Sequence, residues 1–142
     1  MIVLAESILQ LRGFDQNASS AGVLLRSGDS IVLEREPTNR YDANAVTAKT
    51  LDGDLIGRVA REYTESVSAI LKKILHLGIR HRSVLLGTST KIIVCHDGST
   101  YESTRVTLRV EYLVVSVPSD LQIRGLAEAA DGGNVGVVFI MD

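Results

Sequence analysis

The dipeptide Asp52-Gly53 stands between two short stretches of alternating apolar and polar residues, and this arrangement limits the possible folds more than any other feature of the chain. The two stretches cover residues 44–50 and 55–59. A tight turn between paired strands needs positive φ angles at its centre, and Asp-Gly adopts them at low cost. The segment therefore predicts a β-hairpin, and with it an antiparallel sheet.

Similar short runs recur along the chain and are separated by turn-forming residues. We expect strands over residues 1–11, 21–25, 30–35, 44–50, 55–59, 83–86, 92–95, 101–117 and 135–141. The intervening loops and turns are expected at 13–20, 37–42, 87–90 and 97–98. Strands do not alternate regularly with helices, which argues against a parallel doubly wound sheet. The pattern predicts a mainly β fold built on a small curled or barrelled antiparallel sheet.

Two helices are expected beside this sheet. The longer one has apolar residues at i, i+3, i+4, i+7 and i+8, namely Val67, Ile70, Leu71, Ile74 and Leu75. Thr64 suits its N-cap and Gly78 its end. Ser119 and Gln122 have the spacing of a capping box and predict a short helix that runs to Ala130, before the last strand.

The length and composition fit one compact domain. The chain has 142 residues, of which 45% are hydrophobic and only 4% aromatic, so Val, Ile and Leu must fill the core. No apolar run reaches the roughly 18 residues of a membrane-spanning helix, and the N-terminus lacks a signal-peptide pattern. A single cysteine, Cys95, excludes an intramolecular disulfide. We therefore expect an intracellular protein in a reduced compartment, without a membrane partner.

The chain shows none of the common catalytic motifs. It has no phosphate-binding loop, no Gly-x-Ser-x-Gly and no His-Glu-x-x-His. Its histidines, His76, His81 and His96, are not spaced as metal ligands, and no cofactor or metal is expected. An enzyme dependent on Cys95 is an alternative, which requires an exposed and reactive thiolate. We expect a module without catalytic activity.

The charge is unevenly distributed. The net charge of −2 argues against broad binding to nucleic acid. Residues 58–82, however, carry six basic and two acidic side chains, a local +4, which leaves −6 on the rest. This basic segment has two explanations, a solvated helix face or a surface that contacts phosphates.

One contiguous stretch carries more information than the rest. The run from Arg35 to Val46 reads Arg-Glu-Pro-Thr-Asn-Arg-Tyr-Asp-Ala-Asn-Ala-Val, followed by Gly53 and then by Ile-Gly-Arg-Val-Ala-Arg-Glu over residues 56–62. These residues resemble the HIRAN domain, whose signature has the same order, with a long helix next. The resemblance covers about residues 23–77. It implies an OB-like β-barrel that, in proteins that remodel replication forks, holds the free 3′ end of single-stranded DNA.

Two neighbouring residues of this stretch carry the chemistry that the resemblance implies. Tyr41 offers a flat ring on which a terminal base can stack, an interaction worth about 1–3 kcal/mol per base. Asp42 can accept a hydrogen bond from a terminal 3′-hydroxyl and would repel a 3′-phosphate. The alternative is that Asp42, Asn39 and Asn44 make side-chain-to-backbone turns and only shape the loop.

Further candidates surround this pair. Arg58 and Arg61 match positions of the family pattern and can contact phosphates, an Arg doing so bidentately. Asn39 would bond a base or backbone, or hold the loop. Family members that bind DNA ends carry an Arg followed by aromatics after the first strand, which suggests Arg12 and Phe14 here. Tyr101 is a candidate second aromatic.

The sequence thus predicts one HIRAN-like domain over residues 1–142, with residues 118–142 unmatched by the family pattern and available for an extra strand or an oligomer contact. The predicted function is recognition of single-stranded DNA 3′ ends in DNA repair or replication-fork processing, as part of, or partner to, a helicase, an ATPase or a nuclease. The alternative is a protein-interaction or assembly module on the same fold that does not bind DNA.

Overall fold

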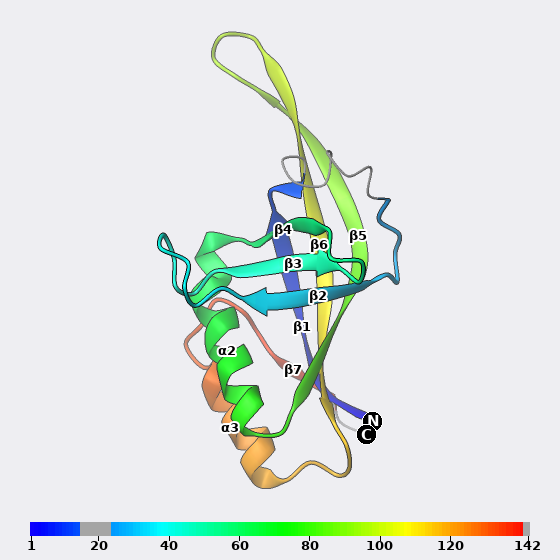
Figure 1. Cartoon of the computed structure of the whole chain (residues 1–142), viewed down its shortest axis with the longest axis vertical. Coiled ribbons are helices and arrows are strands. Elements are labelled where there is room, and N and C mark those ends of the chain that lie inside the picture. The colour runs from blue at the N-terminus through cyan, green and yellow to red at the C-terminus, as the bar shows by residue number, and fades with distance from the viewer. Residues whose placement is uncertain (15–23, 141–142) are drawn as a thin grey trace.

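The computed structural model describes residues 1–14 and 24–140. The strands are β1 (Ile2–Arg12), β2 (Ser30–Arg35), β3 (Val46–Thr50), β4 (Leu55–Val59), β5 (Arg80–Val94), β6 (Thr100–Val114) and β7 (Val138–Phe139). The helices are a single 3-10 turn, η1 (Arg61–Tyr63), and the α-helices α2 (Thr64–His76) and α3 (Asp120–Ala130). Figure 1 shows the strands wrapped around one centre, with both α-helices on one side.

Six of the strands close into an antiparallel barrel, as the sequence predicted. The strand order is β4-β3-β2-β5-β6-β1, and a further pairing of β1 with β4 completes the circle. This last pairing is short and joins Leu11 to Val59 and Arg12 to Arg58. Gly57 makes the close approach possible, because a Cβ at this position would lie 2.6 Å from the carbonyl oxygen of Arg12. β7 pairs with β1 at its other end, beside Ala5 and Glu6.

The barrel interior is filled by aliphatic side chains, in keeping with the aromatic-poor composition. Its largest fully buried members include Leu11, Ile56, Leu85, Leu108 and Val106. Helix α2 packs Val67, Ile70, Leu71 and Ile74 against this core, which confirms the apolar stripe expected from the spacing. Leu75 is the exception, with 76% of its surface exposed. At 3.6 residues per turn the eighth position after Val67 has rotated by about 80°, so it leaves the buried face.

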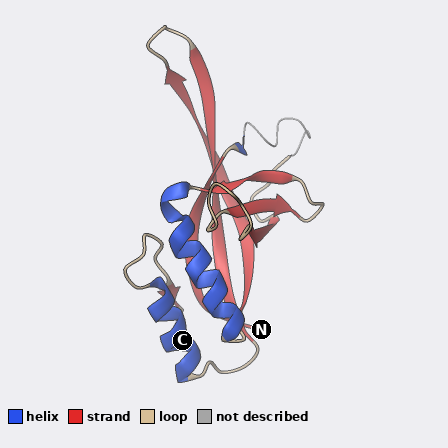
Figure 2. Cartoon of the chain, turned by 60° about the vertical axis from the view of Figure 1, so that its left-hand side comes forward, coloured by secondary structure: helices blue, strands red, loops and turns tan. Residues whose placement is uncertain are grey.

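The C-terminal segment packs against α2. Ser119 and Gln122 form the expected capping box at the start of α3. Gln122 Nε2 also donates to the carbonyl oxygen of Leu77 at the end of α2, at 3.0 Å. Beyond α3, Asn134 Nδ2 donates to the carbonyl oxygen of Glu62 at 2.9 Å, and its backbone N–H donates to Ser66 Oγ. Figure 2 shows the two α-helices side by side along the barrel, and residues 119–134 cover the side of α2 that carries Ser66 and Leu77.

The β5–β6 hairpin differs from the expectation. Two strands separated by a turn at residues 87–90 were expected, but β5 is one continuous strand of 15 residues. Thr88 and Thr90 pair with Val106 and Thr104, and the chain accommodates an extra residue as a bulge between Leu85 and Gly87. The polar run is therefore strand, because distant residues of β6 supply its hydrogen bonds. The turn at residues 97–98 is where it was expected, and Figure 1 shows the hairpin projecting beyond the barrel as an arm.

Some element boundaries also differ. The strand expected at 44–50 begins only at Val46, the one expected at 101–117 ends at Val114, and the last strand is reduced to Val138–Phe139. Thr64 begins α2 but is not its N-cap, a position that Tyr63 occupies. Most of the loop expected at 13–20, residues 21–23 of the strand expected at 21–25, and residue 141 lie outside the described residues. Leu24 and Leu25 are described and are not in a strand.

Candidate functional site

A cavity of about 360 Å³ opens where the loop between β2 and β3 meets the end of β4 and η1. Most of the residues predicted from the family resemblance lie here. The cavity is lined by Asn39, Tyr41, Asp42, Ala45, Val46, Arg58, Val59, Arg61 and Thr64. The fold therefore brings together five of the seven predicted residues, from two segments separated by a hairpin. We call this the loop cavity.

Asn39 shapes the loop from inside. Its Oδ1 accepts hydrogen bonds from the backbone N–H groups of Tyr41 and Asp42, at 2.9 and 3.1 Å. Its Nδ2 donates to Glu36 Oε2 at 2.9 Å. A side chain engaged in this way fixes the backbone of its neighbours. Asn39 is thus seen here in the loop-holding arrangement that was one of the two expectations for it.

Asp42 has two structural bonds and spare acceptor capacity. Oδ1 accepts from the backbone N–H of Asn44 at 2.8 Å, and Oδ2 accepts from Thr64 Oγ1 at 3.2 Å. Thr64 Oγ1 also lies 3.0 Å from the carbonyl oxygen of Arg61. An ionised carboxylate offers about four lone-pair positions, so roughly half remain for a ligand. The carboxylate is held in place at the cavity and is able to accept further hydrogen bonds.

Tyr41 presents its ring to solvent. Tyr41 lines the same cavity as Asp42, and it is 87% exposed although most of its side-chain surface is apolar. The loop holds its backbone N–H but leaves the ring uncovered. An exposed aromatic ring on a held backbone is a suitable platform for stacking, because little ordering of the backbone remains to be done.

Two arginines add positive charge to the loop cavity. Arg58 lies on β4, where its guanidinium is 3.9 Å from Glu36 Oε1, a loose contact. Arg61 opens η1 and is exposed, and it makes no ion pair within residues 1–14 and 24–140. No acidic side chain in the described part of the chain neutralises either guanidinium tightly, so both are available to an anion.

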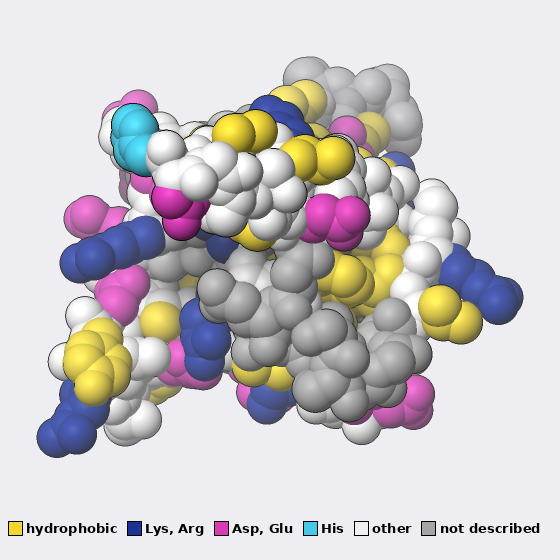
Figure 3. All heavy atoms as spheres, turned by 90° about the horizontal axis from the view of Figure 1, so that it is seen from above, with side chains coloured by type: hydrophobic (Ala, Val, Ile, Leu, Met, Phe, Trp, Pro, Cys, Tyr) yellow, Lys and Arg dark blue, Asp and Glu magenta, His cyan; other side chains and the backbone are white. Residues whose placement is uncertain are grey.

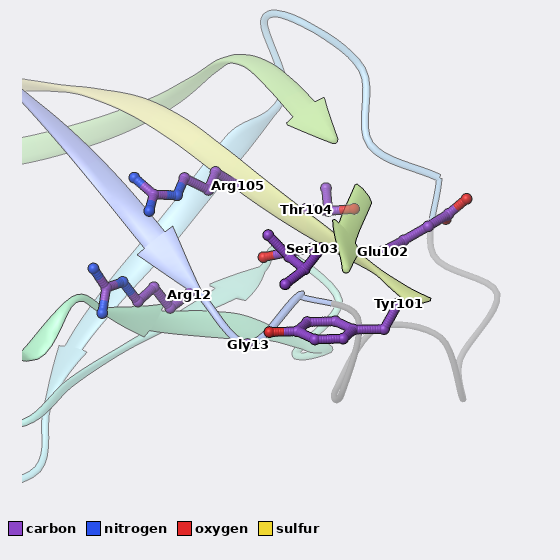
Figure 4. Close-up of a pocket in the computed structure, with 8 residues that line it drawn as sticks. Arg12, Gly13, Tyr101, Glu102, Ser103, Thr104 and Arg105 are labelled. Carbon is purple, nitrogen blue, oxygen red and sulfur yellow. The ribbon is translucent and has the colours of Figure 1, made fainter. Parts of the chain in front are cut away.

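A second cavity, of about 490 Å³, lies between the end of β1 and the side of the arm, along residues 101–105 of β6. We call it the arm cavity. Its lining consists of Arg12, Gly13, Ile93, Tyr101, Glu102, Ser103, Thr104 and Arg105. Figure 4 shows the guanidinium groups of Arg12 and Arg105 on one side and the ring of Tyr101 reaching toward Gly13. Because Arg12 is paired with Arg58 across the barrel closure, the two cavities adjoin.

Arg12 is neutralised by a neighbour in this structure. Its Nη2 lies 2.6 Å from Glu62 Oε1, and both side chains are about half exposed. Arg105 Nη1 donates to Gln10 Oε1 at 3.2 Å on the adjacent strand. Glu62 and Arg105 were not among the residues predicted from the sequence. Glu62 directly follows a predicted arginine, whereas nothing local marks Arg105, which only the pairing of β1 with β6 brings to the site.

Phe14 does not join either cavity. Its ring is partly buried against the hydrophobic core at the end of β1. The predicted aromatic after the first strand therefore packs on the core in this structure, and Tyr101 is the aromatic residue that lines the arm cavity together with Arg12.

The wider surface is mixed in charge. Figure 3 shows basic and acidic side chains interspersed over the face seen from the arm, without one broad basic field. Among the residues that the structure describes, no group of three or more His, Cys, Asp or Glu is placed to hold a metal ion. In the same part of the chain, none of the helices combines the length and the apolar character needed to cross a lipid bilayer.

The closed six-stranded barrel with a polar, loop-lined cavity at its closure defines a small OB-like β-barrel domain. The sequence identifies the family of this domain, because the family model of the HIRAN domain matches residues 11–85, more than half of the chain. The chain belongs to the HIRAN domain family. The resemblance seen in the sequence is thereby confirmed.

Individual proteins are similar over different lengths. A stretch of 48 residues, 34% of this chain, is 31% identical to the helicase-like transcription factor of Mus musculus, and it spans 5% of that protein. The crystal structure of the HIRAN domain of human HLTF superimposes with a TM-score of 0.59 at 15% identity, covering 94% of this chain and 95% of that domain.

Two further solved structures share the barrel. A protein from Lactobacillus plantarum matches with a TM-score of 0.52 at 20% identity, over 78% of this chain and 97% of its own. The HLTF HIRAN domain in its DNA-bound conformation matches with a TM-score of 0.52 at 12% identity, over 90% of this chain and 87% of that one. At these identities the likeness concerns the fold.

Proposed function

We propose that this domain is a DNA-binding module without catalytic activity that recognises the 3′ end of a single strand at the loop cavity. The proposal rests on four groups that line one cavity: the exposed ring of Tyr41, the carboxylate of Asp42 with its fixed position, Arg58 with a loose ion pair, and Arg61 with no ion pair among the described residues. The HLTF domain that shares this fold has a DNA-bound conformation, which supports the same class of ligand here.

The roles follow from the chemistry of each group. The Tyr41 ring stacks on the terminal base, which contributes about 1–3 kcal/mol. Asp42 accepts the hydrogen bond of the terminal 3′-hydroxyl, while Arg58 and Arg61 bind the phosphates behind it. Asn39 acts by holding the loop, since its amide is engaged with the backbone and with Glu36.

The strand continues from the loop cavity into the arm cavity. Arg12 is the link between them, because it lines the arm cavity and pairs with Arg58 in the barrel closure. Tyr101 supplies a second ring for a base further along the strand, and Arg105 lines the same cavity. A module of this kind would serve DNA repair or replication-fork processing as part of, or beside, a helicase, an ATPase or a nuclease. It would act in the compartment of the cell that contains the genome.

The test is a fluorescence-anisotropy titration with two single strands that differ only at the 3′ terminus. The 3′-hydroxyl strand should bind at least about tenfold more tightly than the 3′-phosphate strand, a difference of about 1.4 kcal/mol. A strand with a 5′-phosphate in place of a 5′-hydroxyl is the control for added charge and should bind as well as the unmodified strand. Equal binding of both 3′ forms would remove the role given to Asp42.

The residues are tested in the same assay. Tyr41→Ala should weaken binding by about 5- to 150-fold, the equivalent of one stacked base. Tyr63→Phe is a control for altering a tyrosine outside the cavity lining and should leave the affinity unchanged. Full affinity in Tyr41→Ala would show that the strand does not stack at this cavity.

A second candidate function is protein interaction, and the arm favours it. Ile92 and Val94 lie on one face of the arm, and each is 69% exposed. An isolated two-stranded ribbon is only marginally stable in water, so a partner that covers these side chains would stabilise it. This function predicts no DNA affinity at low salt, together with a stable oligomer or complex in analytical ultracentrifugation.

A further inference from the structure

A basic face on α2 borders the loop cavity on the side away from the arm. Lys72, Lys73 and His76 line a third cavity, of about 440 Å³, together with Ala69, Glu65 and Asn44. Asn44 belongs to the same loop as Asp42, whose carboxylate accepts its backbone N–H. The third cavity therefore begins at the back of the loop that forms the first.

These lysines are not arranged like an ordinary solvated helix face. On such faces acidic side chains usually stand three or four positions from basic ones and pair with them. The residues at those positions around Lys72 and Lys73 are Ser68, Ala69, Ile70, Leu75, His76 and Leu77, with no acid among them. Within the described ranges neither lysine makes an ion pair. Glu65 is the one acidic residue in the lining of this cavity, so the face carries two permanent positive charges against one negative charge.

The direction of α2 decides which strand these charges can reach. Figures 1 and 2 show α2 running from the barrel closure away from the arm. A strand with its 3′ end in the loop cavity and its next nucleotides in the arm cavity runs toward the arm, in the direction opposite to α2. The lysines consequently lie beyond the 3′ terminus, where that strand has no more phosphates.

We propose that the basic face of α2 binds the phosphate backbone of a second strand, one that continues past the 3′ end held in the loop cavity. This inference rests on the proposed function. Lys72, Lys73 and His76 lie within the last five residues of α2, which rise by about 6 Å, so they reach about two phosphates at a spacing of about 3.4 Å along one strand. The preferred ligand is therefore a 3′ end recessed on a longer template, with its last nucleotides unpaired.

The test uses three DNA probes with the same 3′-terminated strand. The first is the single strand alone. The second is annealed to a template that ends flush with the 3′ terminus, and the third to a template that continues by about ten nucleotides, well beyond the roughly two phosphates that the lysines reach. In both annealed probes about three terminal nucleotides are mismatched, so that the end is free to unstack. We expect the continuing template to bind between about twofold and thirtyfold more tightly than the flush one.

The variant Lys72→Gln/Lys73→Gln removes both permanent charges. It should abolish the preference for the continuing template, lower the salt dependence of log K on that probe by about 1.4, and leave the single strand bound as before. Arg26→Gln/Arg124→Gln is the matched control. It removes two exposed charges that line none of the three cavities, and it should retain the preference.

The outcomes separate the two proposals. No preference for the continuing template, or a preference kept by the lysine variant, overturns the second-strand site while discrimination at the 3′ end stands. A lysine variant that weakens all three probes equally also overturns it, because the lysines would then serve the first strand. Loss of discrimination between 3′-hydroxyl and 3′-phosphate, tested separately, removes the proposed function and this inference with it.

Discussion

The closure of the barrel depends on a missing side chain at Gly57, and Gly57→Ala tests this directly. The added Cβ would lie 2.6 Å from the Arg12 carbonyl oxygen and 3.4 Å from Leu11 Cβ. Ordinary contact begins at 3.4 Å, so β1 and β4 must separate by about 0.8 Å. The obstructing atom is backbone, which no rotamer change can move away.

The cost follows from what the separation disrupts. Overpacking in a filled interior costs about 1–3 kcal/mol, and each hydrogen bond weakened at the closure adds about 0.5–1.5 kcal/mol. The closure has only two paired positions, Leu11 with Val59 and Arg12 with Arg58, beside a long bond of 3.4 Å from the Ala60 N–H to the Gln10 carbonyl oxygen. We expect a loss of about 2–4 kcal/mol in the free energy of unfolding.

Urea denaturation followed by circular dichroism measures this loss. Gly87→Ala is the control, because a Cβ at Gly87 meets no atom within 4 Å, and it should stay within about 0.5 kcal/mol of the parent. Folded Gly57→Ala should also bind 3′-terminated strands more weakly, since Arg12 and Arg58 move apart. A Gly57→Ala protein as stable as Gly87→Ala would refute the closure of β1 on β4.

Three other predictions concern single interactions. Glu62→Gln frees Arg12 and should tighten the binding of single strands by about 1.4- to 5-fold. The control Glu34→Gln breaks the ion pair with Lys49 and should leave the affinity unchanged. Equal affinities of the two variants in DNA titrations would show that the Glu62 contact does not compete with DNA. Ser119→Ala removes the cap of α3 and should lower the free energy of unfolding, measured in urea, by about 1 kcal/mol. The control Ser27→Ala lies in a loop and should leave this free energy unchanged. A Ser119→Ala protein as stable as the parent would contradict the capping role. Desolvation lowers the pKa of His81 below its ordinary 6.5, so on acidification the unfolded chain takes up this proton before the folded chain does. The free energy of unfolding should therefore fall as the pH drops below about 6.5. His81→Gln should weaken this pH dependence in urea titrations, and a pH dependence equal to that of the parent would contradict the role given to His81.

Local sequence signals predicted the elements that local interactions form. The Asp52-Gly53 turn, the apolar stripe of α2 and the capping box at Ser119 each depend on residues within a few positions, and each is in place. The continuous β5 strand could not be predicted in this way. Its polar middle resembles a turn, and only pairing with β6 makes it a strand.

The two cavities of the candidate site also differ in whether local sequence could predict them. The loop cavity was predictable because one contiguous stretch carries Asn39, Tyr41 and Asp42 and a nearby one carries Arg58 and Arg61. The arm cavity was not, since Arg12 and Arg105 are brought together by the register of β1 and β6, which no local pattern specifies. Phe14, suggested from the family pattern, packs partly buried against the core, an orientation that no local pattern specifies.

The central position of β6 has a consequence for anyone who wishes to produce the domain. The segment matched by the family ends at residue 85, within β5, and β6 lies wholly beyond it. Yet β6 is the strand that joins β5 to β1, and the matched segment begins only at residue 11. A polypeptide trimmed to it would lack β6 and nearly all of β1, and the edge of β5 would be unpaired. Such a fragment should aggregate rather than fold. The smallest useful expression fragment therefore has to be chosen from the strand order and not from the extent of sequence similarity.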